Sequence, residues 1–240
     1  MKIALVGFGN MGQEIEKLIN ESGEHQIVSK SLTGIDRQWD LEGIKKADVV
    51  IDFTHPSVIL ENIKKVAGIG KNMVVGTTGW YDRLDEVKQI VKKNRIGLIY
   101  AHNFSVGANI FFKIVENASG LFAKFGKYDV YGLEVHHSGK KDSPSGTAIK
   151  IAQQILQNFP AKSKIQPEKL DRQIKTNELH FASVRGGRNP GFHQVVFDSI
   201  ADSVTLTHQA HNRSGFAQGA ILAAEFIKKK KGFYNFDQVF

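Results

Sequence analysis

Short apolar segments alternate with helical patterns through the amino-terminal part of the chain. Five segments have the length and continuous apolar character of strands buried on both faces: KIALVGF, HQIVSKSL, ADVVIDF, NMVVGTT and IGLIYA. Between them apolar residues recur at helical spacing, first at Met11, Ile15 and Leu18, and then over about residues 56–67 and 81–93. This alternation predicts an α/β fold with a Rossmann-like, doubly wound parallel sheet.

The pattern changes after the segment AHNF. A long apolar helix is expected over about residues 108–125, and the longer strands YDVYGLEVHH, LHFASVR, FHQVVFDS and DSVTLTHQA follow. These strands alternate apolar and polar residues, as antiparallel or mixed strands do when one face of the sheet is packed. We therefore predict a second, α+β domain over residues 105–213. The final helix, about 216–230, begins beyond this sheet, so residues 1–104 and 214–240 are assigned to the first domain.

Composition excludes several classes of site. The 240 residues contain no cysteine, so disulfides and Cys-based metal sites are excluded, which fits a reducing cytoplasm. No stretch approaches the roughly 20 apolar residues that span a bilayer. The net charge of +8 favours anionic ligands, among which nucleic acid, phosphorylated cofactors and carboxylates are candidates. Because the lysine run Lys228 to Lys231 suits a solvated helix end, we expect no nucleic-acid partner, and because no apolar stretch is long enough to span a bilayer, we expect no membrane partner.

The motif GFGNMG lies between the first expected strand and the first helix. In a dinucleotide-binding turn, Gly7 permits the tight turn, Gly9 lets the backbone approach a pyrophosphate, and Gly12 allows close packing of helix on strand. A glycine turn in an unrelated α/β protein is the alternative, but strand, helix and position all favour a dinucleotide site. The candidate cofactor-binding residues here are Gly7, Phe8, Gly9, Asn10, Met11 and Gly12.

Cofactor preference depends on the end of the second strand. An acidic residue there would bond the ribose 2′-hydroxyl of NAD and repel the 2′-phosphate of NADP, and none is found at this position. The segment offers Lys30, Ser31, Thr33 and Arg37, while Asp36 is expected in the following loop. This favours NADPH over NADH, unless Lys30 simply faces solvent.

Two further loops follow expected strands at the edge where ligands of such sheets bind. The first, GTTGW, contains Gly76, Thr77 and Thr78, which suit either close approach to a cofactor or an ordinary capped loop. The second, AHNFSVGAN, suits either a hinge or a site, and His102 in it has no evident partner in the sequence. The residues alone leave both loops ambiguous.

The segment EVHHSGKKDSPSGTA concentrates titratable groups before a helix. His136 and His137 at a strand end point to opposite faces, which weakens a metal site. An acid–base site is favoured instead, because imidazole transfers protons near neutral pH and Lys140 can bind an anion or take part in the proton transfer. The helix start from Ser145 to Thr147 offers N–H groups to a carboxylate. An ordinary capped helix would explain the serine and threonine but not the cluster before them.

These motifs together resemble the dihydrodipicolinate reductase family. The segments VGFGNMG, DFTHP, GTTG, NFSVGAN, EVHHSGKKDSPSGTA, SVRGGRNPGFHQVVF and FAQGA occur in the order and spacing of that family along almost the whole chain. The resemblance implies reduction of a cyclic dicarboxylate, 4-hydroxy-tetrahydrodipicolinate, with NADH or NADPH on the route to diaminopimelate and lysine. It also implies a cytoplasmic homotetramer whose first domain binds the dinucleotide and whose second domain binds substrate and forms the oligomer.

The resemblance also implies roles for particular residues, with no metal among them. His136 becomes the proton donor, and Lys140 a second acid or a group that binds a substrate carboxylate. The implied substrate-binding residues are His137, Ser145, Gly146, Thr147 and Arg213. The implied cofactor segments beyond the glycine loop are Gly76, Thr77, Thr78, Ala101, His102, Asn103 and Phe104.

The chain departs from the family pattern at two places that concern the cofactor. Gln13 stands where many members have an arginine, and the second strand lacks the frequent acidic residue.

Two other functions remain open on the sequence. A different dinucleotide oxidoreductase, such as an amino-acid dehydrogenase, has no need for HHSGKKDSPSGT, and a dinucleotide sensor or nucleic-acid binder would not oxidise the cofactor with the cyclic substrate.

Overall fold

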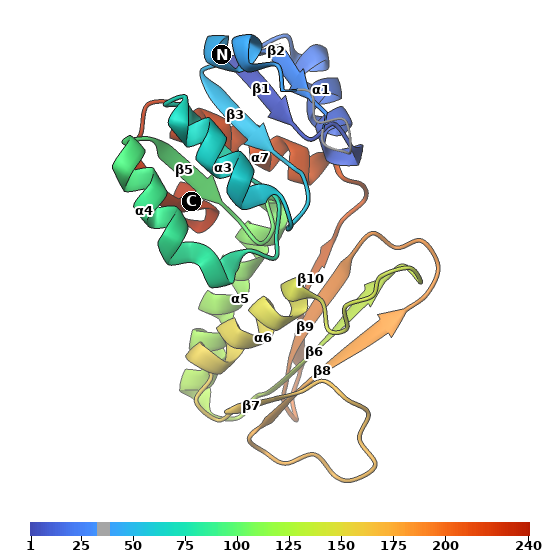
Figure 1. Ribbon diagram of the computed structural model, residues 1–240. Coiled ribbons are helices and arrows are strands. Elements are labelled where there is room, and N and C mark those ends of the chain that lie inside the picture. The colour runs from blue at the N-terminus through green and yellow to red at the C-terminus, as the bar shows by residue number, and fades with distance from the viewer. Residues whose placement is uncertain (33–38) are drawn as a thin grey trace. The chain divides into compact units, whose positions relative to one another are not determined.

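The computed structural model describes residues 1–32 and 39–240, and the chain divides into two units (Figure 1). The first unit comprises residues 1–106 and 213–240, and the second comprises residues 107–212. Each unit has its own sheet and its own hydrophobic core.

Part of the expected cofactor preference cannot be followed in the structure. Thr33, Asp36 and Arg37 lie outside the described residues, so only Lys30 and Ser31 of that segment are described.

The first unit contains a parallel sheet with the strand order β11-β5-β4-β3-β1-β2 in the described residues. Its strands are β1 (Lys2–Val6), β2 (Gln26–Ser31), β3 (Val49–Asp52), β4 (Asn72–Val75), β5 (Gly97–Tyr100) and β11 (Gly232–Asn235). Its helices are α1 (Asn10–Ser22), α2 (Leu41–Lys46), α3 (Ile59–Gly68), α4 (Leu84–Asn94) and α7 (Ser214–Ile227), with short 3₁₀ turns η1 (Tyr81–Arg83) and η2 (Phe236–Val239). The predicted doubly wound α/β sheet is confirmed.

Alternation along β1 shows why helices cover both faces of this sheet. Ile3 and Leu5 pack into one core with residues of α1 and α7, whereas Ala4 and Val6 pack into a second core with α2, α3 and α4. All four side chains are buried, as expected for a strand whose residues point alternately to two covered faces. The edge strand β11 was not predicted, because its four residues are only half-buried and follow a lysine run.

The second unit contains a mixed sheet with the strand order β10-β9-β6-β8-β7. Its strands are β6 (Asp129–His136), β7 (Lys164–Gln166), β8 (Glu178–Arg185), β9 (Phe192–Asp198) and β10 (Ser203–Gln209), and its helices are α5 (Val106–Phe125) and α6 (Gly146–Asn158). The central strand β6 pairs in parallel with β8 and antiparallel with β9. This confirms the predicted α+β character of the carboxyl-terminal part.

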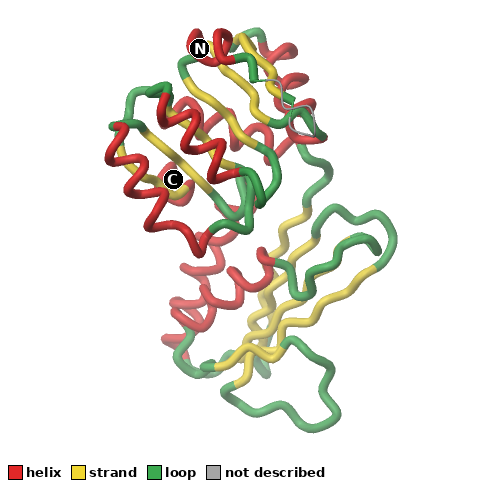
Figure 2. The backbone as a smooth tube through the Cα atoms, in the orientation of Figure 1, coloured by secondary structure: helices red, strands yellow, loops and turns green. Residues whose placement is uncertain are grey.

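One face of the second sheet packs against α5 and α6, which Figure 2 shows on the same side of it. The row of β6 residues facing these helices begins apolar at Val130 and ends polar at Glu134 and His136. The opposite face leaves Tyr131 and Val184 exposed. In the part of the chain that is described, no helix combines the length and apolar character needed to cross a membrane.

Candidate active site

The glycine loop of the first unit has the geometry that its sequence suggested. Gly7 has φ of 89°, and a Cβ there would lie 2.1 Å from the carbonyl oxygen of Phe53. A Cβ at Gly12 would lie 2.5 Å from the carbonyl oxygen of Gly7, so the start of α1 packs closely on the turn. A Cβ at Gly9, the N-cap of α1, would meet no described atom within 4 Å. Space for a ligand therefore lies over the N-terminus of α1.

A pocket of about 350 Å³ opens beside this loop. It is lined by Gly9, Asn10, Met11, Phe53, Thr54, Pro56, Gly76, Thr77, Thr78 and Arg213. The structure thus brings the glycine loop and the GTTG loop together. Arg213, which the family resemblance suggested as a substrate contact, lies in this same pocket, where its guanidinium can meet an anionic group. An open helix N-terminus, close backbone and an arginine fit the phosphates of a dinucleotide.

The residues of the pocket that come from the end of β3 were missed from the sequence. Phe53, Thr54 and Pro56 belong to the segment DFTHP, whose place after a buried strand was the available signal, because ligands bind at the carboxyl ends of such strands.

The buried Asp52 accepts hydrogen bonds from two hydroxyl groups of residues that line the pocket. Its Oδ1 accepts hydrogen bonds from Thr54 Oγ1 at 2.8 Å and Thr77 Oγ1 at 2.9 Å, and its Oδ2 accepts one from Asn62 Nδ2 at 2.8 Å. Thr77 Oγ1 in turn accepts the backbone N–H of Thr54 at 2.7 Å. Burial raises the pKa of Asp52 to about 6, although these donors oppose the rise.

The segment AHNF after β5 has a packing role. Ala101 and Phe104 are buried in the first core, and the Phe104 ring lies 6.1 Å from Phe53, which lines the pocket. His102 contacts the ring of Tyr81 with centroids 4.1 Å apart. Asn103 Oδ1 accepts the backbone N–H of Ser105. Within the described residues, the pocket lining does not include this segment, so a contact of these residues with a cofactor remains a prediction.

Lys30 on β2 lies beside the glycine loop. Its ammonium is 2.6 Å from Glu16 Oε1 and 4.8 Å from the centre of the Phe8 ring. The neighbouring Ser31 is fully buried, and its hydroxyl accepts the backbone N–H of Asp40. Lys30 is therefore the described group of this segment that can reach a ligand on the loop.

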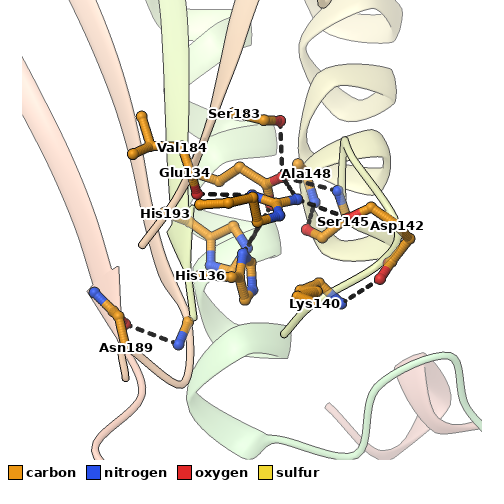
Figure 3. Close-up of polar contacts among 12 residues, drawn as sticks. Glu134, His136, Lys140, Asp142, Ser145, Ala148, Ser183, Val184, Asn189 and His193 are labelled. Atoms are coloured by element: carbon orange, nitrogen blue, oxygen red, sulfur yellow. Dashed lines mark hydrogen bonds and ion pairs between the residues drawn. The ribbon is translucent and has the colours of Figure 1, made fainter. Parts of the chain in front are cut away.

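The second candidate site lies in the second unit, at the carboxyl end of β6 (Figure 3). Glu134 and His136 lie two positions apart and so share one face of the strand. Glu134 is fully buried, and its Oε1 accepts hydrogen bonds from Ser145 N at 2.9 Å, Ser183 Oγ at 2.8 Å and Arg185 Nη2 at 2.7 Å. Burial works to raise the pKa of Glu134, but these donors outweigh it and lower the pKa to about 2.

The other carboxylate oxygen of Glu134 faces two buried histidines. Oε2 lies 3.2 Å from His136 Nδ1 and 3.7 Å from His193 Nε2, and β9 places His193 directly opposite Glu134 in the antiparallel register. Burial lowers the pKa of His136, and burial together with the neighbouring His136 lowers the pKa of His193 to about 3. Both rings therefore favour the neutral form at neutral pH in the ligand-free protein.

The distances within this cluster would also suit a metal ion, because ligand atoms of Glu134, His136 and His193 lie within 4.8 Å of one another. Arg185 already places a positive charge on the same carboxylate. A cation between the three side chains would be repelled by this guanidinium, so we interpret the cluster as an ion-pair and hydrogen-bond network.

The loop after β6 carries the remaining polar groups. Lys140 Nζ lies 2.8 Å from Asp142 Oδ1. Burial works to raise the pKa of Asp142, but hydrogen bonds from Lys140 and from the backbone of Gly146 lower it below its usual value. The exposed His137 lies beyond the strand end and donates its backbone N–H to the carbonyl of Asn189 at 2.8 Å. The two adjacent histidines thus have different surroundings, one buried and one exposed, as their alternation predicted.

Ser145 has an internal role in the start of α6. It is buried, its backbone N–H donates to Glu134, and its hydroxyl accepts the backbone N–H of Ala148 at 3.1 Å as the N-cap. Gly146 is exposed and Thr147 is half-buried in the first turn that follows. The helix start therefore offers an anion the N–H groups after Ser145 more readily than the serine itself.

Three residues of this site were missed from the sequence: Glu134, Arg185 and His193. Glu134 had a usable signal, because a carboxylate two positions before a histidine on a strand points to the same face of the strand as the histidine. Arg185 and His193 reach the site through strand pairing, and their spacing along the chain carries no such signal.

Comparison with known proteins shows to which family the chain is similar. The family model described as "Dihydrodipicolinate reductase, N-terminus" matches residues 1–104, and the one described as "Dihydrodipicolinate reductase, C-terminus" matches residues 107–240. A 4-hydroxy-tetrahydrodipicolinate reductase of Christiangramia forsetii is 40% identical over 239 residues, covering 100% of this chain and 97% of the relative. One from Methanocaldococcus jannaschii is 38% identical, covering 98% and 95%.

Solved structures show the same similarity in three dimensions. A dipicolinate-bound dihydrodipicolinate reductase from Paenisporosarcina sp. TG-14 superposes with a TM-score of 0.81 at 25% identity, covering 100% of this chain and 99% of that one. A DAP dehydrogenase of C. glutamicum in complex with DAP shares the fold alone, with a TM-score of 0.54 at 14% identity over 99% of this chain and 93% of that one. Because family models match both parts and relatives match the full length, the chain belongs to the dihydrodipicolinate reductase family.

Proposed function

We propose that this chain reduces 4-hydroxy-tetrahydrodipicolinate to tetrahydrodipicolinate with NADPH or NADH, in the biosynthesis of diaminopimelate and lysine. The observation that carries the proposal is the match of both reductase family models and of full-length relatives with this activity. The two sites add a physical basis, since one suits a phosphorylated dinucleotide and the other suits acid–base chemistry on a dicarboxylate.

The first unit would hold the dinucleotide. Gly9, Asn10 and Met11 at the start of α1 would bind phosphates through backbone N–H groups, and Arg213 would contribute charge. The GTTG loop would contact the remainder of the molecule, with Thr77 held in place by Asp52. When bound, the nicotinamide supplies the hydride for the reduction. NADPH is expected to be modestly preferred, because Lys30 is near the loop and the segment lacks the acidic residue that repels a 2′-phosphate.

The second unit would bind the substrate and supply the proton. His136 is proposed as the proton donor to the position of the ring that becomes electron-rich, because its imidazole is buried beside an ionised carboxylate. Lys140 is proposed to release Asp142 and to bind a substrate carboxylate in its place, since its ammonium can form an ion pair with either carboxylate. The N–H groups of Gly146, once released from Asp142, and of Thr147 would hold the second carboxylate, with His137 as a further contact.

We also propose a cytoplasmic homotetramer. The second sheet has helices on one face only, and its other face leaves the apolar side chains of Tyr131 and Val184 exposed. Such a face favours association with another copy of the chain. Light scattering of the purified protein tests this, and a persistent monomer at micromolar concentration would contradict it.

The activity is tested by following NAD(P)H absorbance with enzymatically generated 4-hydroxy-tetrahydrodipicolinate. We expect the protein to oxidise either cofactor only when this substrate is present. Dipicolinate, the ligand of the solved relative, should inhibit this oxidation. Pyruvate, 2-oxoglutarate and ammonia serve as control substrates for an amino-acid dehydrogenase. Turnover of these with none of the cyclic substrate would overturn the proposal.

A further inference from the structure

The two oxygens of the Glu134 carboxylate have different surroundings. Oε1 is held by three donors from the start of α6 and from β8. Oε2 accepts no hydrogen bond among the described residues and faces His136 Nδ1 at 3.2 Å and His193 Nε2 at 3.7 Å. The carboxylate is thus fixed by one oxygen and directs the other at an imidazole.

This contact determines which nitrogen of the neutral His136 ring carries the proton. Glu134 is ionised at neutral pH because its pKa is about 2, so Oε2 offers only lone pairs. A ring nitrogen with its own lone pair would be repelled at 3.2 Å, whereas a ring N–H is attracted even where the hydrogen bond is not well aligned. The proton of the neutral ring is therefore favoured on Nδ1. His193 competes weakly, since its nearest nitrogen is 3.7 Å from the same oxygen.

The other nitrogen of His136 faces a position that is kept small. An ideal Cβ on Gly191 would lie 3.2 Å from His136 Nε2 and 3.7 Å from His193 Cε1. A larger residue at 191 would crowd this nitrogen, so glycine there leaves Nε2 approachable.

We propose that Glu134 is a positioning residue, which keeps the proton of the neutral His136 imidazole on Nδ1 and so reserves Nε2 as the atom that exchanges a proton with the substrate. This inference rests on the proposed function, because it takes His136 as the proton donor. It adds a residue that acts through His136 without touching the substrate. It also fixes the order of events, because Nε2 can donate only after the ring has taken up a second proton.

The imidazolium formed in that way is surrounded by groups of both signs. The charged and titratable groups around the ring are Glu134 on β6, Arg185 on β8, His193 on β9, and Lys140 and Asp142 in the loop after β6. The two carboxylates favour the imidazolium, while burial, the arginine and the lysine oppose it. Removing the charge of Glu134 should therefore lower the pKa of His136.

Nitrogen-15 NMR of the histidine rings tests the proposal without any turnover, because two-bond correlations distinguish the two neutral tautomers. The His136 signals are assigned by their loss in His136→Gln. In the wild-type protein, at a pH where the ring is neutral, we expect the proton on Nδ1. In Glu134→Gln the amide can donate to Nδ1, and we expect a substantial population with the proton on Nε2.

Kinetics supply the second measurement. Glu134→Gln should lower kcat by about 10²-fold, part of the about 10⁴-fold loss that a wrong tautomer causes in a Ser-His-Asp triad. The alkaline limb of its pH–rate profile should move to lower pH. The matched control is Glu178→Gln, which alters another buried carboxylate of the same sheet, paired with Arg172 at 2.8 Å. This control should leave kcat and the His136 tautomer unchanged.

The outcomes separate this inference from the proposed function. A wild-type His136 that carries its neutral proton on Nε2 would overturn the inference, and this holds even if Glu134→Gln fails to fold. A Glu134→Gln protein with the Nδ1 tautomer and full kcat would overturn it as well. If His136→Gln retains full kcat, the proton-donor role is wrong, while the spectra still decide whether Glu134 sets the tautomer.

Discussion

Asp52 in the first unit and Glu134 in the second are both 0% exposed, yet their pKa values move in opposite directions. Asp52 receives hydrogen bonds from two hydroxyls and an amide, all neutral, and its pKa rises to about 6. Glu134 receives a hydroxyl, a backbone N–H and the guanidinium of Arg185, and its pKa falls to about 2. Two carboxyl groups without solvent-exposed surface therefore have pKa values shifted in opposite directions.

The difference lies in the set of donors around each carboxyl, which includes a charged group only at Glu134. Burial disfavours the ionised form of both carboxyls, and neutral donors offset it only in part. At Glu134 the hydrogen bonds from Ser145, joined by those from the Arg185 guanidinium and from Ser183, together outweigh burial and reverse the sign of the shift. In the first unit the carboxylate organises neutral pocket hydroxyls, and in the second it organises an imidazole that must gain and lose charge. Substitutions in both units test this contrast.

The largest expected effect is on kcat. His136→Ala should lower kcat by about 10²–10⁴-fold, the usual contribution of a general acid, with cofactor affinity nearly unchanged. Asp52→Ala removes the acceptor of Thr54 and Thr77 and should instead weaken cofactor binding. Steady-state kinetics with both substrates varied, and cofactor titration by fluorescence, separate the two effects. Full kcat in a folded His136→Ala protein would move the proton-donor role to Lys140 or water.

The two carboxyls should give stability opposite dependences on pH. Asp52 has a raised pKa, so its contribution is complete below about 3.8 and is lost as the pH rises through about 6. Asp52→Asn cannot ionise, and relative to wild type its free energy of unfolding should improve by roughly 3 kcal/mol between pH 4 and pH 7. Urea unfolding at both pH values measures the difference. A difference that does not change with pH would mean that Asp52 has an ordinary pKa.

Glu134 should show the reverse dependence in the same experiment. Its contribution is present above the ordinary pKa of 4.5 and is lost as the pH falls through about 2. The deficit of Glu134→Gln relative to wild type should therefore grow by roughly 3 kcal/mol as the pH rises from about 2 to about 5. A deficit that shrinks over this range would contradict the role assigned to Ser145, Arg185 and Ser183 in lowering the pKa of Glu134.

Lys140 brings a second positive charge, besides that of Arg185, to the site of the second unit. Lys140→Ala should lower kcat/KM by roughly 10–100-fold, with effects on both KM and kcat, because a hydrogen bond to a charged group contributes about 1.5–3 kcal/mol. Lys140→Arg keeps the charge and should recover part of KM. An unchanged KM in Lys140→Ala would show that the lysine does not bind a substrate carboxylate.

Asp142 should compete with the substrate for Lys140. Their ion pair is 2.8 Å long, but the aspartate side chain is 57% exposed, so the pair is worth about 0.2–1 kcal/mol. Asp142→Asn should therefore lower KM by a small factor and leave the fold intact. Asp85→Asn, which removes a similar exposed pair with Lys88 in the first unit, is the control. A raised KM in Asp142→Asn would show that Asp142 assists binding.

The smallest expected effect concerns the one cation that we propose for cofactor preference among the described residues. Lys30→Ala should lower kcat/KM for NADPH several-fold and leave that for NADH nearly unchanged, because only NADPH has a 2′-phosphate. Glu16→Gln releases Lys30 from its 2.6 Å pair and should strengthen the preference. Equal losses with both cofactors would show that Lys30 does not reach the ribose.

The sequence predicted the parts of the molecule that local rules control. Apolar periodicity gave the parallel sheet, and the glycine spacing gave the turn before α1, because both depend on neighbours within a few residues. Alternation along β6 predicted that His136 and His137 would face different ways. The roles of individual residues in binding and catalysis remain predictions.

The residues that tune the sites could not be found in this way. Arg185 lies 51 residues from Glu134 in sequence and reaches it through the parallel register of β6 and β8. Asn62 reaches Asp52 from α3, and Thr77 reaches it from the loop after β4. A single sequence does not show strand register or which buried groups form hydrogen bonds with one another, so the opposite pKa shifts could be found only from the structure.

The most direct test of the contrast between the two carboxyls is carbon-13 NMR titration of the Asp52 and Glu134 side chains, assigned with Asp52→Asn and Glu134→Gln. We expect midpoints of about 6 for Asp52 and about 2 for Glu134. Midpoints shifted in the same direction, or a Glu134 midpoint above its ordinary 4.5, would contradict the account that the donors around each carboxyl set its ionisation state.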